Sequence, residues 1–358
     1  MKTSIATVSL SGDLADKLSA TAAAGFDAVE IFENDFLAFD LGARDVGKMV
    51  RDAGLEISLF QPFRDFEGLP EPQRAKAFDR ARRKFETMNE LGTDLILICS
   101  TVSPLALGGI DRAADDLRDL GEIARAAGVR IGYEALAWGR YVSDHRDAWE
   151  IVRRADHPNV GLILDSFHTL SRGIDPGSIR SIPKDKIFIV QMADAPKLDL
   201  DLLSWSRHYR NMPGQGELPV ADFMAAVEAT GYAGYYSLEI FNDQFRAGSA
   251  RQTAVDGRRS LFFLMDRLKA EGRALNGPSE KEPFPPPAKT SGVSFCEFAT
   301  DRASATRLSA LLTSIGFRHA GHHRSKDVDL FTQGDLRVVV NTETEGFAHS
   351  SYVVHGTN

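Results

Sequence analysis

Short apolar runs alternate with longer amphipathic segments along the first 271 residues of the chain. The runs are rich in Val, Ile, Leu and Phe, which is typical of buried parallel strands, and the segments between them carry apolar residues at helical spacing. The pattern predicts strands at residues 4–10, 28–32, 56–62, 95–100, 130–136, 160–166, 187–192 and 235–241. It predicts helices at residues 13–24, 43–53, 71–91, 110–127, 144–154, 176–182, 220–229 and 252–271.

Glycines end several of the predicted helices, at Gly25, Gly54, Gly92 and Gly128. A helix that stops at glycine and is followed by a strand is the repeated unit of an α/β protein. Eight such pairs over this length are typical of a (β/α)₈ TIM barrel. A doubly wound open sheet is the alternative, but it would not readily bring the ends of strands five to eight together.

The composition of the chain changes after the last predicted helix. We expect a barrel at residues 1–274, and residues 275–291 (LNGPSEKEPFPPPAKTS) form a proline-rich segment typical of a semi-rigid linker. In residues 292–358 a strand at 293–299, a helix at 303–315 and strands at 317–322, 328–332 and 336–341 predict a single βαβββ module. One such module cannot bury both faces of its sheet, so we expect it to be truncated or to self-associate as a homo-oligomer.

Composition excludes several classes of function. A formal net charge of −8 without a Lys/Arg block argues against a nucleic-acid partner. No apolar run approaches about 20 residues, so we expect no membrane span, and the N-terminus does not resemble a signal peptide. Cys99 and Cys296 lie far apart in sequence, which argues against a disulfide framework and favours a cytoplasmic location.

Four predicted strands end in an oxygen-bearing side chain: Glu134, Asp165, Gln191 and Glu239. Each of these taken singly can be an ordinary capping or ion-paired residue. Because the carboxyl ends of barrel strands open on one rim, we expect the four to converge. Three carboxylates and an amide oxygen suit Mg²⁺ or Mn²⁺ better than Zn²⁺.

Candidate substrate-binding residues follow the strands. His168 lies three residues after Asp165, and beside a cation it is expected to stay neutral and available as a base, although a structural role is the alternative. The long segment 195–218 carries Ser206 and Arg210, and Arg64 follows the third strand. These arginines can hold an anionic substrate or can pair with nearby acids. The sequence HAGHH at residues 319–323 has no carboxylate at ligand spacing, so we do not expect it to bind metal.

The stretches around Glu134, DSFH (165–168), QMAD (191–194), HYRNMPGQGEL (208–218) and SLEIFND (237–243) give the chain a family resemblance. It resembles the xylose-isomerase-like superfamily of metal-dependent sugar isomerases and epimerases. Within that superfamily it is most similar to the bacterial 3-dehydroshikimate dehydratases. Several of those enzymes carry a C-terminal extension related to 4-hydroxyphenylpyruvate dioxygenase, of the vicinal-oxygen-chelate type built from βαβββ modules.

The resemblance implies that Glu134, Asp165, Gln191 and Glu239 hold a divalent ion (Mg²⁺, Mn²⁺ or Co²⁺). It implies that His168 moves the proton, with Arg64, Ser206 and Arg210 on the carboxylate substrate. The expected reaction is elimination of water from 3-dehydroshikimate to give protocatechuate, as in quinate and shikimate degradation. A sugar isomerase or ketose epimerase on the same barrel is the alternative, and a non-catalytic binding scaffold is a second one. The tail lacks the later part in which such dioxygenases bind iron, so we do not expect dioxygenase activity.

Overall fold

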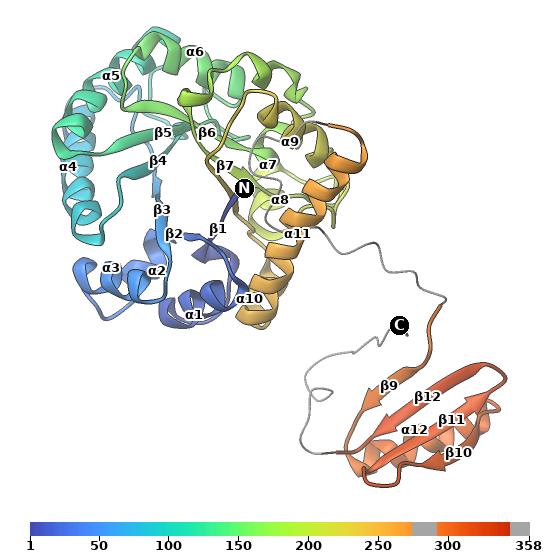
Figure 1. Ribbon diagram of the computed structural model, residues 1–358. Coiled ribbons are helices and arrows are strands. Elements are labelled where there is room, and N and C mark those ends of the chain that lie inside the picture. Colours follow the sequence, from blue (N-terminus) through green and yellow to red (C-terminus); the bar gives the residue numbers. More distant parts are fainter. Residues whose placement is uncertain (274–291, 344–358) are drawn as a thin grey trace. The chain divides into compact units, whose positions relative to one another are not determined.

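The computed structural model describes residues 1–273 and 292–343, which belong to two compact units (Figure 1). The predicted linker at residues 275–291 and the end of the chain from residue 344 lie outside the described residues, so the linker stays a prediction.

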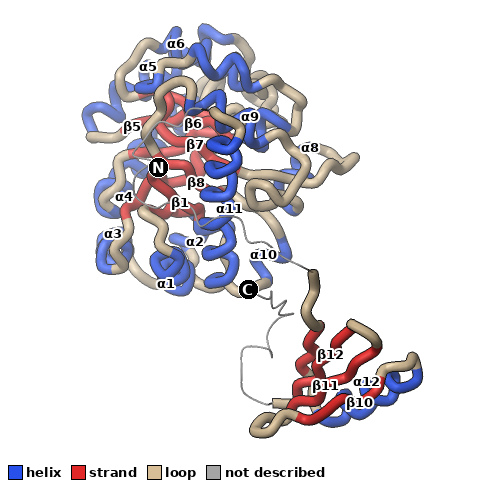
Figure 2. Tube along the Cα trace, turned by 45° about the vertical axis from the view of Figure 1, so that its right-hand side comes forward, coloured by secondary structure: helices blue, strands red, loops and turns tan. Residues whose placement is uncertain are grey.

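The first unit is a closed barrel of eight parallel strands in chain order. Figures 1 and 2 show these strands at the centre of the unit. Closure comes from β1 pairing with β8, where Ile5 lies opposite Leu238. The predicted TIM barrel is confirmed. Its strands are β1 (Lys2–Ala6), β2 (Ala28–Phe32), β3 (Glu56–Phe63), β4 (Leu95–Cys99), β5 (Arg130–Glu134), β6 (Val160–Asp165), β7 (Ile187–Met192) and β8 (Tyr235–Leu238).

Helices surround the strands (Figure 1). The long ones are α1 (Leu14–Ala24), α3 (Ala43–Asp52), α4 (Gln73–Leu91), α5 (Ile110–Ala127), α6 (His145–Ala155), α9 (Val220–Glu228) and α11 (Ala250–Ala270). Gly92 after α4 and Gly128 after α5 have φ angles of 83° and 72°, so these helices stop at residues in the left-handed region, as predicted.

Alternation along the strands divides the core into two layers. On β4, Ile96 and Ile98 pack in the large cluster between strands and helices. Leu95, Leu97 and Cys99 belong to a smaller cluster, and Leu97 and Cys99 line a pocket with Glu134, so this face points into the barrel. Both faces of the strand are therefore apolar, as expected of a parallel sheet covered by helices.

Several boundaries differ from the predictions. The first strand ends at Ala6, because Thr7–Ser9 form a 3₁₀ turn, and Pro176–Ser181 are also 3₁₀ and not an α-helix. Four short helices were not predicted: α2 (Glu33–Leu37), α7 (Ser166–Leu170), α8 (Leu202–His208) and α10 (Asp243–Ala247). Helices of five to seven residues are too short to show a hydrophobic period. Three of them begin at a side-chain cap, Asp165, Asp201 or Asn242, whereas α2 has no such cap.

The second unit is the predicted βαβββ module: β9 (Cys296–Ala299), α12 (Arg302–Ser314), β10 (Arg318–His322), β11 (Val328–Gln333) and β12 (Leu336–Asn341). The sheet order is β10-β11-β12-β9, with β9 parallel to β12. Its buried apolar cluster is small, formed by Leu312, Phe331 and Val340. Asp329 on β11 supplies a carboxylate between His319 and His322, which local spacing did not reveal, at 2.6 and 3.1 Å from their ring nitrogens.

In the parts that the structure describes, no helix combines the length and the apolar character that crossing a membrane requires.

Candidate functional site

The four predicted oxygen ligands stand at one rim of the barrel. Glu134 and Asp165 are the last residues of β5 and β6, Gln191 is next to last in β7, and Glu239 directly follows β8. Asp165 and Gln191 are register partners on adjacent strands. All four side chains belong to the buried polar set of the barrel. Since the strands are parallel, their carboxyl ends bring these residues to the same end.

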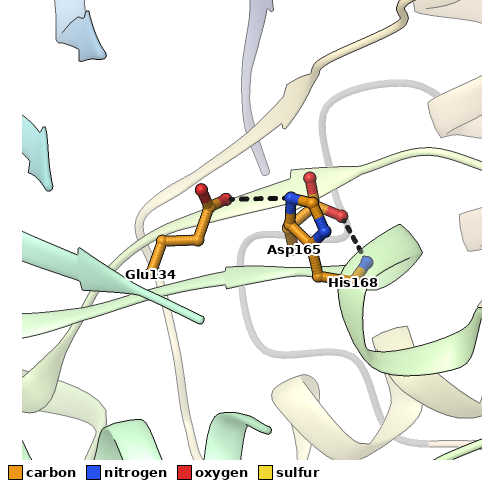
Figure 3. A group of neighbouring side chains, drawn as sticks. All are labelled: Glu134, Asp165 and His168. Carbon is orange, nitrogen blue, oxygen red and sulfur yellow. Dashed lines mark hydrogen bonds and ion pairs between the residues drawn. The ribbon is translucent and has the colours of Figure 1, made fainter. Parts of the chain in front are cut away.

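Glu134, Asp165 and His168 form the tightest group, with one possible ligand atom from each within 4.8 Å of the others (Figure 3). Asp165 begins α7 as its N-cap and accepts a hydrogen bond from the backbone N–H of His168 at 3.1 Å. The sequence DSFH therefore places the imidazole one helical turn above the carboxylate. Nε2 of His168 lies 3.9 Å from Oε1 of Glu134.

Arg210 links Glu239, the third candidate carboxylate ligand, to this group. Its Nη1 donates to Oδ2 of Asp165 at 2.8 Å and to Oε2 of Glu239 at 2.9 Å. The side chain is almost fully buried, at 1% exposed. Its Nη2 and Nε donate to Oγ of Ser206 at 2.8 and 3.2 Å.

These contacts bear on the prediction that Ser206 and Arg210 bind substrate. Both residues line the pocket above the carboxylates, yet the guanidinium is committed to Asp165, Glu239 and Ser206. Their contact with substrate stays a prediction. The geometry favours a different primary role, in which Arg210 balances two buried negative charges.

A further buried carboxylate, Glu30 on β2, was not predicted. Its Oε2 accepts from Nε2 of Gln61 at 2.6 Å and from Nε2 of Gln191 at 2.9 Å. Glu30 is 0% exposed, and it reaches Gln191 from a strand that is not adjacent to β7. The signal was present in the sequence, because AVEIF is also an apolar run with one carboxylate.

The carboxylates differ in their protonation. Burial and the nearby Glu239 raise the pKa of Glu134 well above its ordinary value, and the same two causes raise the pKa of Glu30 to about 8. Burial opposes ionisation of Asp165 as well, but Arg210 and His168 lower its pKa below the ordinary value. The cluster thus holds more acid than its one guanidinium can neutralise, and it favours additional positive charge.

His168 is neutral in this environment, because burial lowers its pKa to about 3. Its Nδ1 accepts a hydrogen bond from the backbone N–H of Ala137 at 3.1 Å. Nη2 of Arg210 lies 3.3 Å from Nε2 but has a closer acceptor in Ser206. Only one nitrogen of a neutral imidazole accepts, so the ring carries its proton on Nε2, which lies toward Glu134. This tautomer presents a hydrogen-bond donor toward Glu134, and the role of His168 in moving the proton stays a prediction.

A pocket opens above the carboxylates and is lined by two arginines that have no ion-pair partner among the described residues, Arg64 and Arg207. Arg207 stacks on Trp138 and Phe241, with its guanidinium carbon 5.9 and 4.5 Å from the ring centres. Burial and the proximity of Arg64 lower the pKa of Arg207. Two arginines without an ion-pair partner in one pocket are typical of an anion-binding position.

The loop that carries α8 over the pocket is held by Asp194. Its carboxylate accepts from the backbone N–H groups of Gly214, Gly216 and Leu218, each at 3.0 Å. A Cβ on Gly216 would lie 2.4 Å from Oδ1 of Asp194, so this position requires glycine. The motif PGQGEL therefore serves to shape the loop.

The donor set fits a divalent cation. Oε1 of Glu134 and Oε1 of Gln191 are both buried and lack a hydrogen-bond partner in the described structure. Buried acceptors without partners cost free energy unless something binds them. A hard cation such as Mg²⁺ or Mn²⁺ takes oxygen ligands of this kind.

The family model for the xylose isomerase-like TIM barrel matches residues 18–262, most of the barrel unit. The chain belongs to the xylose isomerase-like TIM barrel family. A second family model, for the N-terminal part of hydroxyphenylpyruvate dioxygenase, matches residues 284–358 and agrees with the resemblance of the tail.

A 3-dehydroshikimate dehydratase of Pseudomonas putida is 55% identical over 359 aligned positions, covering 99% of this chain and 56% of that protein. A solved xylose isomerase-like TIM barrel/4-hydroxyphenylpyruvate dioxygenase fusion protein is also 55% identical, with a TM-score of 0.82 over 98% of this chain and 56% of that one. The chain thus spans about half the length of these relatives. The IolI protein, solved with a bound zinc atom, shares the barrel fold at 22% identity, with a TM-score of 0.69 over 75% of this chain and 99% of that one.

Proposed function

We propose that the barrel catalyses metal-assisted elimination of water from 3-dehydroshikimate to give protocatechuate. The observation that carries the proposal is an acidic, oxygen-rich cluster with unpartnered acceptors beneath two unpaired arginines of the described barrel. The 55% identity with a dehydratase of this specificity supports it.

The substrate has the features that this site can recognise. 3-Dehydroshikimate is a carboxylate that bears an enone, with an acidic carbon next to the ketone and a hydroxyl placed to leave. Removing a ring proton and the hydroxyl releases one water, and tautomerisation then gives the aromatic ring. The site must therefore hold a carboxylate, stabilise charge on the ketone oxygen and move one proton.

Glu134, Asp165, Gln191 and Glu239 would hold the divalent ion. When bound, such an ion supplies Lewis-acid polarisation of the ketone, worth several kcal/mol of charge stabilisation. Arg210 would favour the ionised form of Asp165, whose pKa it lowers, and it would oppose the burial that raises the pKa of Glu239. The bound species, Mg²⁺, Mn²⁺ or Co²⁺, is part of the proposal.

His168 would donate its Nε2 hydrogen to the oxygen on which negative charge develops, as a neutral electrophile. This revises the expectation that it is the base. The titratable groups that line the pocket are Arg64, Cys99, Glu134, His168, Arg207, Arg210 and Glu239. Among them, Oε1 of Glu134 is a carboxylate oxygen without a hydrogen-bond partner in the described residues.

Glu134 is therefore our candidate base. With one carboxylate oxygen binding the ion, the other would take the ring proton and return it to the departing hydroxyl, so that no net proton is gained or lost. The burial that raises its pKa also makes it a stronger base once it is ionised.

Arg64 and Arg207 would hold the substrate carboxylate. Both line the pocket, and neither has a carboxylate partner among the described residues. They also line a neighbouring basic cleft with Arg80, Arg83 and Lys84, which favours approach of an anion.

The test is a substrate panel. The purified chain with Mn²⁺ is given 3-dehydroshikimate, a free ketose and an inosose, which is a neutral cyclic polyol ketone, and near-ultraviolet absorbance and chromatography follow the products. Formation of protocatechuate is the expected result. Conversion of the ketose or inosose alone would favour an isomerase, and binding without turnover of any of the three would favour a scaffold.

A cytoplasmic location, absence of a nucleic-acid partner and self-association through the tail remain proposals. The described cysteines, Cys99 and Cys296, are free thiols, in keeping with a reducing compartment.

A further inference from the structure

Glu30 and Gln191 meet inside the barrel. Oε2 of Glu30 lies 2.9 Å from Nε2 of Gln191 and 2.6 Å from Nε2 of Gln61. Glu30 and Gln191 are 0% exposed and Gln61 is 2% exposed, so water does not compete for these contacts.

The chemistry of the pair fixes the orientation of the amide. Both glutamines donate to Oε2 of Glu30. This oxygen accepts in the carboxylate, and it also accepts in the acid when the proton is on Oε1, which has no partner among the described residues, so it faces the NH₂ end of each glutamine. Gln191 then presents Oε1 on its other side, and this oxygen has no partner among the described residues. An amide turned the other way would offer a cation two N–H groups, which cannot act as ligands.

We propose that Glu30 is a positioning residue that turns Gln191 so that its oxygen faces the metal site. Gln191 is the one neutral member of the four-residue set, and it is the one whose two terminal atoms differ in their affinity for a cation. Outer hydrogen bonds that orient a ligand typically change metal affinity by about 10–100-fold. The inference rests on the proposed metal site and is independent of the proposed substrate.

Two simpler roles for Glu30 lead to different expected results. If its charge merely attracts the cation, then any neutral replacement weakens binding. If it only fills space in the barrel, then an apolar residue of the same length leaves binding unchanged.

The test measures Mn²⁺ affinity of the metal-free full-length chain by titration calorimetry, with circular dichroism to show that each variant is folded. Glu30→Met removes the acceptor at similar volume, and a loss of affinity of about 10–100-fold is expected. Glu30→Gln removes the ionisable group but keeps an amide oxygen that accepts from Gln191, and its affinity should stay within about threefold of wild type.

A double-mutant cycle separates an effect through Gln191 from an independent one. Gln191→Met removes the ligand itself. If Glu30 acts by orienting Gln191, the Glu30→Met/Gln191→Met pair should bind Mn²⁺ no more weakly than Gln191→Met alone. Independent contributions would instead add.

Glu67 offers a matched control. It is also a buried glutamate whose carboxylate accepts two hydrogen bonds, from Thr101 N–H at 2.6 Å and Tyr133 OH at 2.9 Å, but it contacts none of the four candidate ligands. Glu67→Met should lower the unfolding temperature without changing Mn²⁺ affinity.

If Glu30→Met does not fold, the exchange Glu30→Gln/Gln191→Glu keeps the hydrogen bond and the total charge. It should be more thermally stable than Gln191→Glu alone, in which two carboxylates face each other, and should bind Mn²⁺ within about threefold of wild type.

Three results would each overturn the proposal: equal losses of Mn²⁺ affinity in Glu30→Met and Glu30→Gln, unchanged affinity in both, or additive losses in the double-mutant cycle. So would an exchange variant no more stable than Gln191→Glu. Failure of the wild-type chain to bind Mn²⁺ would overturn the metal site and this inference together. A chain that binds Mn²⁺ as described but does not dehydrate 3-dehydroshikimate would overturn only the proposed substrate.

Discussion

Nη1 of Arg210 donates to Oδ2 of Asp165 at 2.8 Å, and the two side chains are 1% and 0% exposed. The residues are 45 positions apart, and the pair anchors the α8 loop to the end of β6. One buried cation thus connects the loop above the pocket with the acidic cluster beneath it.

Arg210→Met should destabilise the metal-free barrel by about 3–5 kcal/mol, because it leaves buried carboxylates without their countercharge. Tryptophan fluorescence during urea unfolding measures this, since all three tryptophans lie in residues 138–205 of the barrel. Arg83→Met, at an exposed arginine on α4, is the control, and its effect should stay within about 0.5 kcal/mol. Similar midpoints for both variants would contradict the role of Arg210.

Arg207→Met should raise KM for 3-dehydroshikimate about tenfold to hundredfold with a smaller change in kcat. It removes a charge-assisted contact with a part of the substrate that does not react. Arg125→Met, at an arginine paired with Glu122 on α5, should leave KM unchanged. Steady-state kinetics of the two variants test the proposal, and an unchanged KM for Arg207→Met would remove Arg207 from the substrate site.

His168 should remain neutral with its proton on Nε2 from pH 5 to pH 8, since burial lowers its pKa to about 3. Two-bond ¹H–¹⁵N correlation spectra of the ¹⁵N-histidine-labelled chain report the tautomer directly. The set of cross-peaks that is missing from the spectrum of His168→Gln belongs to His168. A resonance that titrates near pH 6.5, or a ring protonated on Nδ1, would contradict the donor role.

Glu67 should make the stability of the barrel depend on pH. Burial raises its pKa to about 7 from 4.5, so the folded state favours the protonated acid. Its stabilisation is complete below pH 4.5 and is lost as the pH rises toward 7. Relative to Glu67→Gln, the wild-type chain should lose about 2–3 kcal/mol of unfolding free energy between pH 5 and pH 8. Urea unfolding of both with chelator present measures the difference, and parallel pH profiles would refute it.

The barrel and its rim were readable from the sequence because parallel strands bury both faces. A lone carboxylate in such a strand, as at Glu134 or Asp165, therefore stands out against apolar neighbours, and the common direction of the strands places the ends together. Two further features follow from local rules. Gly92 ends α4 because glycine readily adopts the left-handed conformation, and the apolar run at Ile187–Met192 sets the length of β7.

Contacts between side chains that lie far apart in the sequence could not be predicted in this way. Arg210 is a countercharge and not a free substrate-binding group because it contacts Asp165 and Glu239, which lie 45 and 29 positions away. The tautomer of His168 depends on the backbone of Ala137. Glu30, like the four predicted ligands, is a polar residue in an apolar run. Its role could not be predicted because it depends on contact with Gln191, 161 positions away.

Titration of the metal-stripped chain with Mn²⁺ while protocatechuate is formed from 3-dehydroshikimate tests the central claim most directly. We predict no detectable turnover without metal, a rate that saturates as one Mn²⁺ binds per chain, and no such response in Glu239→Ala despite an unchanged circular dichroism spectrum. Turnover by the fully stripped chain, or a wild-type response in Glu239→Ala, would contradict the account.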